Sequence, residues 1–168
     1  MNEQEFVDQA WEENIRFFSH HENITDEETK IYNDSRYEKY VTAEIENPRW
    51  SYVRWMVAKL EHNKNNHVKS FELQKKNWEE CTHYGSGFEL VNLYRIGLGT
   101  RKDIVKSKNL LNSLLNEHFS QHAFEIIVSI VGNKSRVLAE KIKRILDTNC
   151  HELITSIDID EIFEVWDL

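Results

Sequence analysis

The scarcity of proline and glycine is the sequence feature that most restricts the fold of this chain. One proline and five glycines stand among 168 residues. Tight turns draw on both residue types, so a fold of many short strands would need more of them. Apolar residues instead recur at helical spacing along most of the chain. The sequence therefore predicts an all-α fold without any convincing strand.

Capping signals and apolar spacing place the expected helices. The first is expected from Glu3 to about Ser19. Thr25 and Glu28 fit a capping box at the start of the second. Asn47 before Pro48 predicts that another helix starts there, with Asn47 as the cap. A further helix is expected to end near 84–87. The helices after it are expected to span 88–96, 103–116, 123–131 and 135–147, and a short acidic helix is expected within 157–168.

Charge is segregated along the chain, although its length suits a single domain over 1–168. Residues 1–48 carry a net charge of −9, residues 49–148 carry +7, and residues 149–168 carry −6. Two interpretations follow. The acidic ends can fold against the basic middle and neutralise it, or an acidic surface can stay open to a cationic partner.

Several classes of protein are not expected from this sequence. No stretch approaches the roughly 18 apolar residues that a membrane helix needs, so no membrane partner is expected. The acidic start lacks the basic and apolar regions of a secretory signal. Cys81 and Cys150 show no motif spacing and are expected to be reduced thiols. We therefore expect a cytoplasmic protein.

A weak internal repeat runs through the basic middle of the chain. "HVKSFEL" at 67–73 matches "IVKSKNL" at a shift of 37, and "FELV" at 88–91 matches "FEII" at a shift of 36. The next helix returns at a shift of about 33. The unit is two helices and a short turn, used about three times between 49 and 148. The fold expected is a short α-solenoid of stacked helix hairpins with flanking N- and C-terminal helices.

The stretch "YRIGLGTRKD" at 94–103 is expected to be a corner between two such helices. Gly97 can close the first helix in the left-handed conformation, and Gly99 can complete the reversal. Thr100 is expected to cap the next helix, with Asp103 three residues later as in a capping box. A phosphate loop is not expected, because the GxxxxGK[ST] spacing and a preceding βαβ unit are missing.

Residues 88–123 resemble a Sel-like repeat, a tetratricopeptide relative with a glycine-bearing turn. The matching residues are Leu90, Tyr94, Gly97, Gly99, Asp103, Lys106 and Ala123. The sequence departs from the pattern at Phe88, Val91, Ser107 and Leu115. The resemblance covers about a fifth of the chain. It implies an α-solenoid that binds proteins and has no catalytic role.

Candidates for chemistry are few. His118 and His122 are four residues apart, but the zinc-protease order HExxH is absent, and the pair falls at an expected corner. Cys81 and His83 lack an orienting acid in the sequence. No catalytic residue, metal or cofactor is therefore expected.

The five tryptophans divide into two groups. Trp11, Trp50, Trp78 and Trp166 are expected in the core or between helices. Trp55 lies off the side defined by Trp50, Val53 and Val57. It is therefore the tryptophan expected to anchor a partner.

The acidic C-terminal segment is the other expected binding site. Ile159, Ile162, Phe163 and Trp166 can cover one side of a helix and dock it on the solenoid. The carboxylates expected to face a partner are Asp158, Asp160, Glu161 and Glu164. The alternative is that they pair with Lys141, Lys143 and Arg144 on the preceding helix.

Small, acidic, helical chains without catalytic residues resemble the immunity proteins of bacterial toxin systems. That resemblance implies a protein partner, a cationic toxin domain, whose nucleic acid substrate the acidic chain mimics in charge. The second hypothesis is a scaffold or adaptor that binds a peptide or protein in the solenoid groove. Nucleic-acid binding through Tyr52, Arg54 and Trp55 is disfavoured by the acidic ends.

Overall fold

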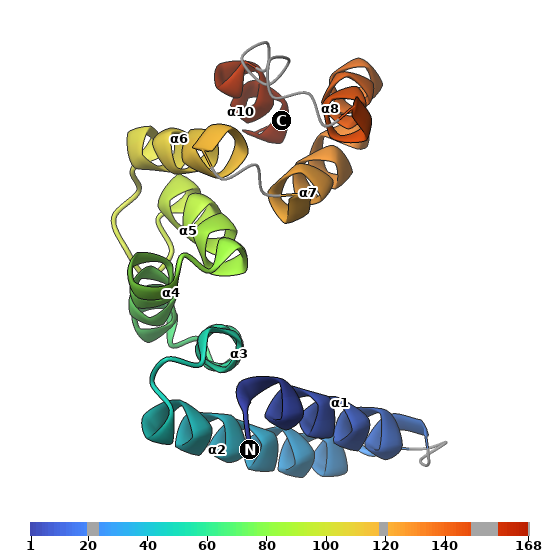
Figure 1. Ribbon diagram of the computed structural model, residues 1–168, viewed down its shortest axis with the longest axis vertical. Helices are drawn as coiled ribbons and strands as arrows, with labels where there is room; N and C mark the ends of the chain where they lie inside the picture. The colour runs from blue at the N-terminus through green and yellow to red at the C-terminus, as the bar shows by residue number, and fades with distance from the viewer. Residues whose placement is uncertain (20–23, 118–120, 149–157, 168) are drawn as a thin grey trace. The chain divides into compact units, whose positions relative to one another are not determined.

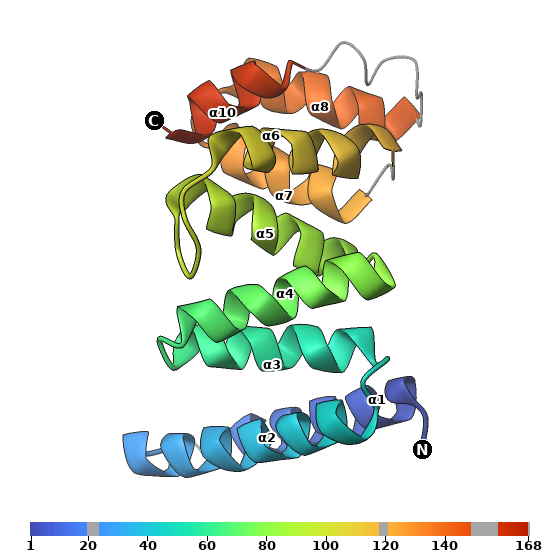
Figure 2. The ribbon, with the colours of Figure 1, turned by 90° about the vertical axis from the view of Figure 1, so that its left-hand side faces the viewer.

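The computed structural model describes residues 1–19, 24–117, 121–148 and 158–167 (Figures 1 and 2). Every regular element in these ranges is helical, which confirms the all-α prediction. The elements are α1 (Glu3–Ser19), α2 (Asp26–Glu46), α3 (Ser51–Asn63), α4 (His67–Cys81), α5 (Tyr84–Ile96), α6 (Ile104–Asn112), the π-helical turn η1 (Ser113–Glu117), α7 (Gln121–Gly132), α8 (Arg136–Thr148) and α10 (Ile159–Asp167).

The chain divides into two compact units, unit 1 (Met1–Leu73) and unit 2 (Gln74–Leu168). This boundary lies within α4, whereas the charge pattern changes sign after residues 48 and 148. Unit 1 holds 15 acidic and 9 basic residues, and unit 2 holds 14 and 12. Unit 1 is therefore the more acidic, at −6 against −2. The expectation of a single domain stays a prediction.

In unit 1, α1 and α2 run antiparallel and side by side (Figure 2). The Phe6 and Tyr40 rings meet edge to face with centroids 5.4 Å apart, and the Phe17 and Tyr32 rings stack at 4.1 Å. The capping box of Thr25 and Glu28 starts α2 as predicted. The small buried core consists of Phe6, Ala10, Tyr40, Ala43, Val53 and Val57.

The prediction that Asn47 caps the third helix is wrong. Asn47 ends α2, where its backbone N–H and its side-chain amide both donate to the carbonyl of Ala43, at 2.9 and 3.3 Å. Helix α3 begins at Ser51, after Trp50. The buried guanidinium of Arg54 bonds the carbonyl of Pro48 and lies 3.3 Å from the Glu44 carboxylate. The start of α3 is instead capped from α1, because the Glu3 carboxylate accepts from the N–H groups of Tyr52 and Val53 at 2.7 and 3.1 Å.

In unit 2, consecutive helices pack in pairs, α5 with α6 and α7 with α8, as in a short α-solenoid. Helix α10 packs on α6 and α7 (Figure 1). Their shared core is apolar and much larger than that of unit 1. Its buried members are Phe88, Val91, Leu111, Leu114, Leu115, Ala123, Phe124, Ile127, Val131, Leu138, Ala139, Ile142, Ile145, Ile162 and Phe163.

The expectation that "YGSG" ends a helix is also wrong. Helix α4 stops at Cys81, and α5 begins at Tyr84 with His83 as its cap. Gly87 is buried in the first turns of α5, where an added Cβ would lie 2.6 Å from Cε3 of Trp78. This glycine therefore permits close packing of an indole ring rather than a turn.

Equivalent positions of the proposed repeat have matching environments. Val68 of α4 and Val105 of α6 are both exposed, and Ser70 and Ser107 are both buried. The Ser107 hydroxyl donates to the carbonyl of Val91 at 2.5 Å. A small hydrogen-bonding residue therefore suits a helix side that packs closely against its neighbour.

The corner between α5 and α6 contains both glycines in the left-handed region, with φ of 77° at Gly97 and 72° at Gly99. The N–H groups of Gly97 and Leu98 donate to the carbonyl of Leu93, which closes α5. The predicted cap at Thr100 is wrong. Asp103 caps α6, and its carboxylate accepts from the N–H of Lys106 at 3.0 Å. Residues 100–103 are outside the helix, so the cap lies three residues later than predicted.

Candidate protein-binding surfaces

Helix α10 is anchored on unit 2 by the apolar residues expected to dock it. Ile162 and Phe163 are buried, and Trp166 is half-buried. The Trp166 ring stacks on Phe88 with centroids 5.8 Å apart, and the Arg95 guanidinium lies 4.7 Å from its centre. The apolar side of α10 is therefore packed against the core of unit 2.

The four candidate carboxylates of α10 are all exposed. Asp160 is 2.6 Å from Lys108 of α6, a partner that the sequence did not suggest. Glu161 is 4.0 Å from Lys141, one of the residues named in the alternative interpretation. Asp158 accepts from the N–H of Asp160 at the helix start. Glu164 has no ion pair with any residue that the structure describes, so it is the clearest free charge on this surface.

Trp55 is half-buried rather than projecting as a free anchor. Its ring is tilted against Tyr52 at 5.3 Å, and the Lys59 ammonium lies 4.5 Å from its centre. Its binding role stays a prediction. Arg54, named beside it as a nucleic-acid candidate, is completely buried and points to Glu44 and Pro48. That geometry leaves no guanidinium at this position for a phosphate.

Trp11 corrects the division of the tryptophans. It was expected in the core, but it is exposed on α1 together with Ile15 and Phe18. The signal was present in the sequence, because α1 carries apolar residues on two sides. Phe6 and Ala10 lie on the side that packs in unit 1. Counting how far around the helix the apolar residues extend would have found the second side.

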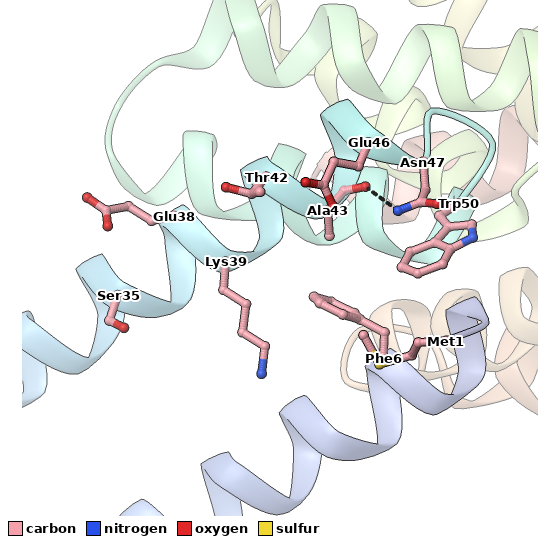
Figure 3. A pocket seen from close by; sticks show the side chains of 10 residues that line it. All are labelled: Met1, Phe6, Ser35, Glu38, Lys39, Thr42, Ala43, Glu46, Asn47 and Trp50. Atoms are coloured by element: carbon pink, nitrogen blue, oxygen red, sulfur yellow. Dashed lines mark hydrogen bonds between the residues drawn. The ribbon is translucent and has the colours of Figure 1, made fainter.

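The cleft between α1, α2 and the start of α3 has a volume of about 390 Å³ (Figure 3). Phe6 and Trp50 form its aromatic lining, and Lys39 reaches into it. Lys39 is already paired with Glu13 at 2.7 Å, and its ammonium lies 5.5 Å from the centre of the Phe6 ring. The cleft contains no arrangement of acid, base and nucleophile among these residues.

A buried carboxylate organises the polar side of unit 1. Glu61 accepts from the Tyr37 hydroxyl at 2.6 Å and from the Asn66 amide at 2.8 Å, and it pairs with Lys69. Burial alone would raise the pKa of Glu61, but the hydrogen bonds from Lys69, Tyr37 and Asn66 bring it below the ordinary value. The same bonds raise the pKa of Tyr37 and of Lys69. Asn66 and Lys69 thereby hold the α3–α4 corner, and Tyr37 ties α2 to α3.

The histidine and cysteine candidates do not assemble a site. Nδ1 of His83 accepts from the N–H of Ser86 at 3.1 Å, so this ring caps α5. Cys81 is a free thiol, and Cys150 lies outside the described residues. His118 lies outside them as well, and the side chain of His122 is not described. Within the described ranges, no three His, Cys, Asp or Glu side chains gather as metal ligands.

Comparisons of the chain with protein-family models, with curated proteins and with solved structures give no match. The Sel-like resemblance therefore stays a prediction that rests on its own residues. No helix in the described part of the chain is both long and apolar enough to cross a membrane.

Proposed function

We propose that the chain is a non-catalytic protein-binding module, an immunity protein that binds and neutralises a cationic bacterial toxin domain. One observation carries the proposal. Helix α10 is fixed to unit 2 by its buried apolar residues, while Asp158, Asp160, Glu161 and Glu164 face outward.

This arrangement suits rapid capture of a positively charged protein. The helix does not have to order itself on binding, because Ile162 and Phe163 already hold it. Exposed carboxylates attract a cationic partner over about a Debye length, so they act on the association rate. Ion pairs at the protein surface contribute only about 0–1 kcal/mol. Asp160 and Glu161 can therefore leave Lys108 and Lys141 and bind a partner at little cost.

The second candidate is a scaffold or adaptor that binds a peptide or protein. The hairpin pairs α5–α6 and α7–α8 favour it, since stacked helix pairs present extended surfaces for partners. The two candidates differ in what the partner does when it is alone. A toxin arrests growth without this chain, whereas an adaptor's partner does not.

The test begins with affinity capture of the tagged chain from its own host, followed by expression of each captured protein alone and with this chain. We expect a basic protein that arrests growth alone and is tolerated in the presence of this chain. If no captured protein is toxic, the immunity proposal is wrong and the adaptor remains.

Charge reversal then locates the surface. Glu164→Lys removes a carboxylate that has no described ion pair, so the melting temperature should hardly move. Association with the captured toxin should slow by about 3- to 10-fold at low salt and much less at high salt. Glu140→Lys on α8 is the matched control, because Glu140 is exposed and this substitution also changes the net charge of unit 2 by two units. Equal slowing in both variants would show that total charge matters and α10 does not.

A further inference from the structure

One side of α1 holds the helix in unit 1. Phe6 and Ala10 are buried there, and Phe17 stacks on Tyr32. Polar contacts add to this attachment. Lys39 bonds Glu13, the Tyr32 hydroxyl lies 3.3 Å from Asn14, and the Glu3 carboxylate accepts from the N–H groups of Tyr52 and Val53 at 2.7 and 3.1 Å. Helix α1 is therefore a fixed element whose other side is available.

That other side carries an apolar stripe formed by Trp11, Ile15 and Phe18. These side chains are 60%, 50% and 48% exposed. The Phe18 ring also meets the rings of Phe17 and Tyr32 edge to face, with centroids 5.1 and 5.8 Å apart, so one end of the stripe is packed on α2 and Trp11 and Ile15 form its open part. Steps of four and three residues put them in line along about two turns, roughly 10 Å of helix. An exposed apolar row led by a tryptophan is typical of the centre of a binding interface rather than of ordinary surface.

Carboxylates follow one edge of the stripe. Glu5, Asp8 and Glu12 are exposed and lie three and four residues apart, so they form a row beside Trp11 and Ile15. Neither Asp8 nor Glu12 has an ion pair with a residue in the described ranges; Asp8 accepts only from the amide of Gln4. Arg16 is the single basic residue of α1. It lies one turn beyond Glu12 in the same row, so the edge is negative along Glu5, Asp8 and Glu12 and ends in one positive charge.

We infer that the outer side of α1 binds a basic amphipathic helix of the protein partner. The inference rests on the proposed function and names a second surface and the partner's chemistry for it. Apolar anchors at such spacing suit a helix laid alongside, and a lysine- or arginine-rich flank on that helix would complement Glu5, Asp8 and Glu12. A second copy of α1 would bring two acidic rows together, and an anionic bilayer would be repelled.

The test uses a synthetic 14-residue peptide of leucine and lysine, patterned as an amphipathic helix, with a leucine and glutamate peptide as its charge control. Binding is measured by fluorescence anisotropy of the labelled peptide. We expect the basic peptide to bind and the acidic one not to. The double substitution Trp11→Ala/Phe18→Ala should weaken binding by at least 10-fold, and Asp8→Lys/Glu12→Lys should weaken it and flatten its salt dependence.

Two control variants match these changes. Ile31→Ala/Ile45→Ala removes two isolated apolar side chains that are 64% and 70% exposed on α2, and it should leave peptide affinity unchanged. Glu38→Lys/Glu46→Lys on α2 makes the same change of charge in unit 1 as Asp8→Lys/Glu12→Lys, and it should also leave peptide affinity unchanged. Circular dichroism of every variant confirms that the fold is retained.

Three outcomes overturn the inference. These are no binding of the basic peptide, equal binding by the Trp11→Ala/Phe18→Ala variant, and equal binding of both peptides. Analytical ultracentrifugation of the parent that shows a dimer abolished by Trp11→Ala/Phe18→Ala overturns it as well, because the occupant is then a second copy. The peptide assay does not involve α10 or toxicity. A negative peptide result would therefore contradict this inference but not the proposed function. Conversely, a failure to capture a toxin would contradict the proposed function but not a positive peptide result.

Discussion

Helices α1 and α10 have a similar pattern of acidic and apolar residues, but they differ in which of those residues are buried. Both are acidic and amphipathic, and each belongs to one unit of the chain. In α10, Ile162 and Phe163 are buried and only charge is presented outward. In α1, Phe6 and Ala10 are buried, but Trp11 and Ile15 remain exposed. Amphipathic character alone therefore does not show how many apolar sides a helix has. It also does not show which of those sides packs against another helix of the fold.

The two units also differ in how they are stabilised. Unit 2 has fifteen buried apolar residues in one core, whereas unit 1 has six, together with the fully buried Arg54 and Glu61. A buried charge requires specific hydrogen-bond partners, but apolar burial does not. Unit 1 should therefore be more sensitive to pH and to single polar substitutions than unit 2.

The largest expected difference compares the same substitution in the two helices. Ile162→Ala empties a fully buried site in unit 2 and should lower the free energy of unfolding by about 3 kcal/mol. Ile15→Ala removes a half-exposed side chain from α1 and should change it by less than about 0.5 kcal/mol. Urea unfolding followed by circular dichroism measures both. Similar losses would mean that the outer side of α1 is covered in solution.

A smaller effect is expected at the buried carboxylate of unit 1. Glu61→Gln keeps the shape but removes the charge that Tyr37, Asn66 and Lys69 hold, so we expect a loss of about 2 kcal/mol at pH 7. The pair with Lys69 contributes little of this, since Lys69 is more than half exposed. The matched control Glu12→Gln on the surface of α1 should be neutral.

The lowered pKa of Glu61 fixes the sign of the pH dependence. Its folded-state pKa lies below the ordinary value of 4.5, so its contribution to stability is complete above that value and is lost as the pH falls through the folded pKa. As the pH falls, hydrogen-exchange protection factors should therefore decrease in α2 and α3 before they do so in α7, and the difference should shrink in Glu61→Gln. An equal decrease in both units would contradict this origin.

The smallest expected effect compares two of the helix corners that contain a left-handed residue. Gly97→Val should cost about 1–2 kcal/mol from the left-handed conformation alone. An added Cβ would also lie 3.0 Å from the backbone nitrogen of Lys102. Asn65, at φ 63° in unit 1, tolerates this conformation better than most residues, so Asn65→Gly should change stability by less than about 0.5 kcal/mol. Equal melting temperatures for Gly97→Val and the parent would show that the corner relaxes.

Local interactions account for what the sequence predicted well. The capping box of Thr25 and Glu28 and the left-handed Gly97 depend on groups within a few residues, so the helix ends there follow from spacing alone. The starts of α3 and α6 were misplaced. At α3, the free N–H groups are capped by Glu3, which is distant in the sequence, and at α6 two acceptable caps stood three residues apart.

The exposure of single residues, in contrast, was decided by the tertiary structure. Trp11 is exposed although it was expected in the core, and Asp160 pairs with Lys108, which lies 52 residues away in the sequence. Helical periodicity fixes which residues share a side, but burial depends on whether another helix packs against that side. The sequence by itself therefore determined an all-α chain with acidic, amphipathic ends. Only the packing of α2 against one side of α1, and of α6 and α7 against α10, decided that α1 keeps an apolar surface and α10 a charged one.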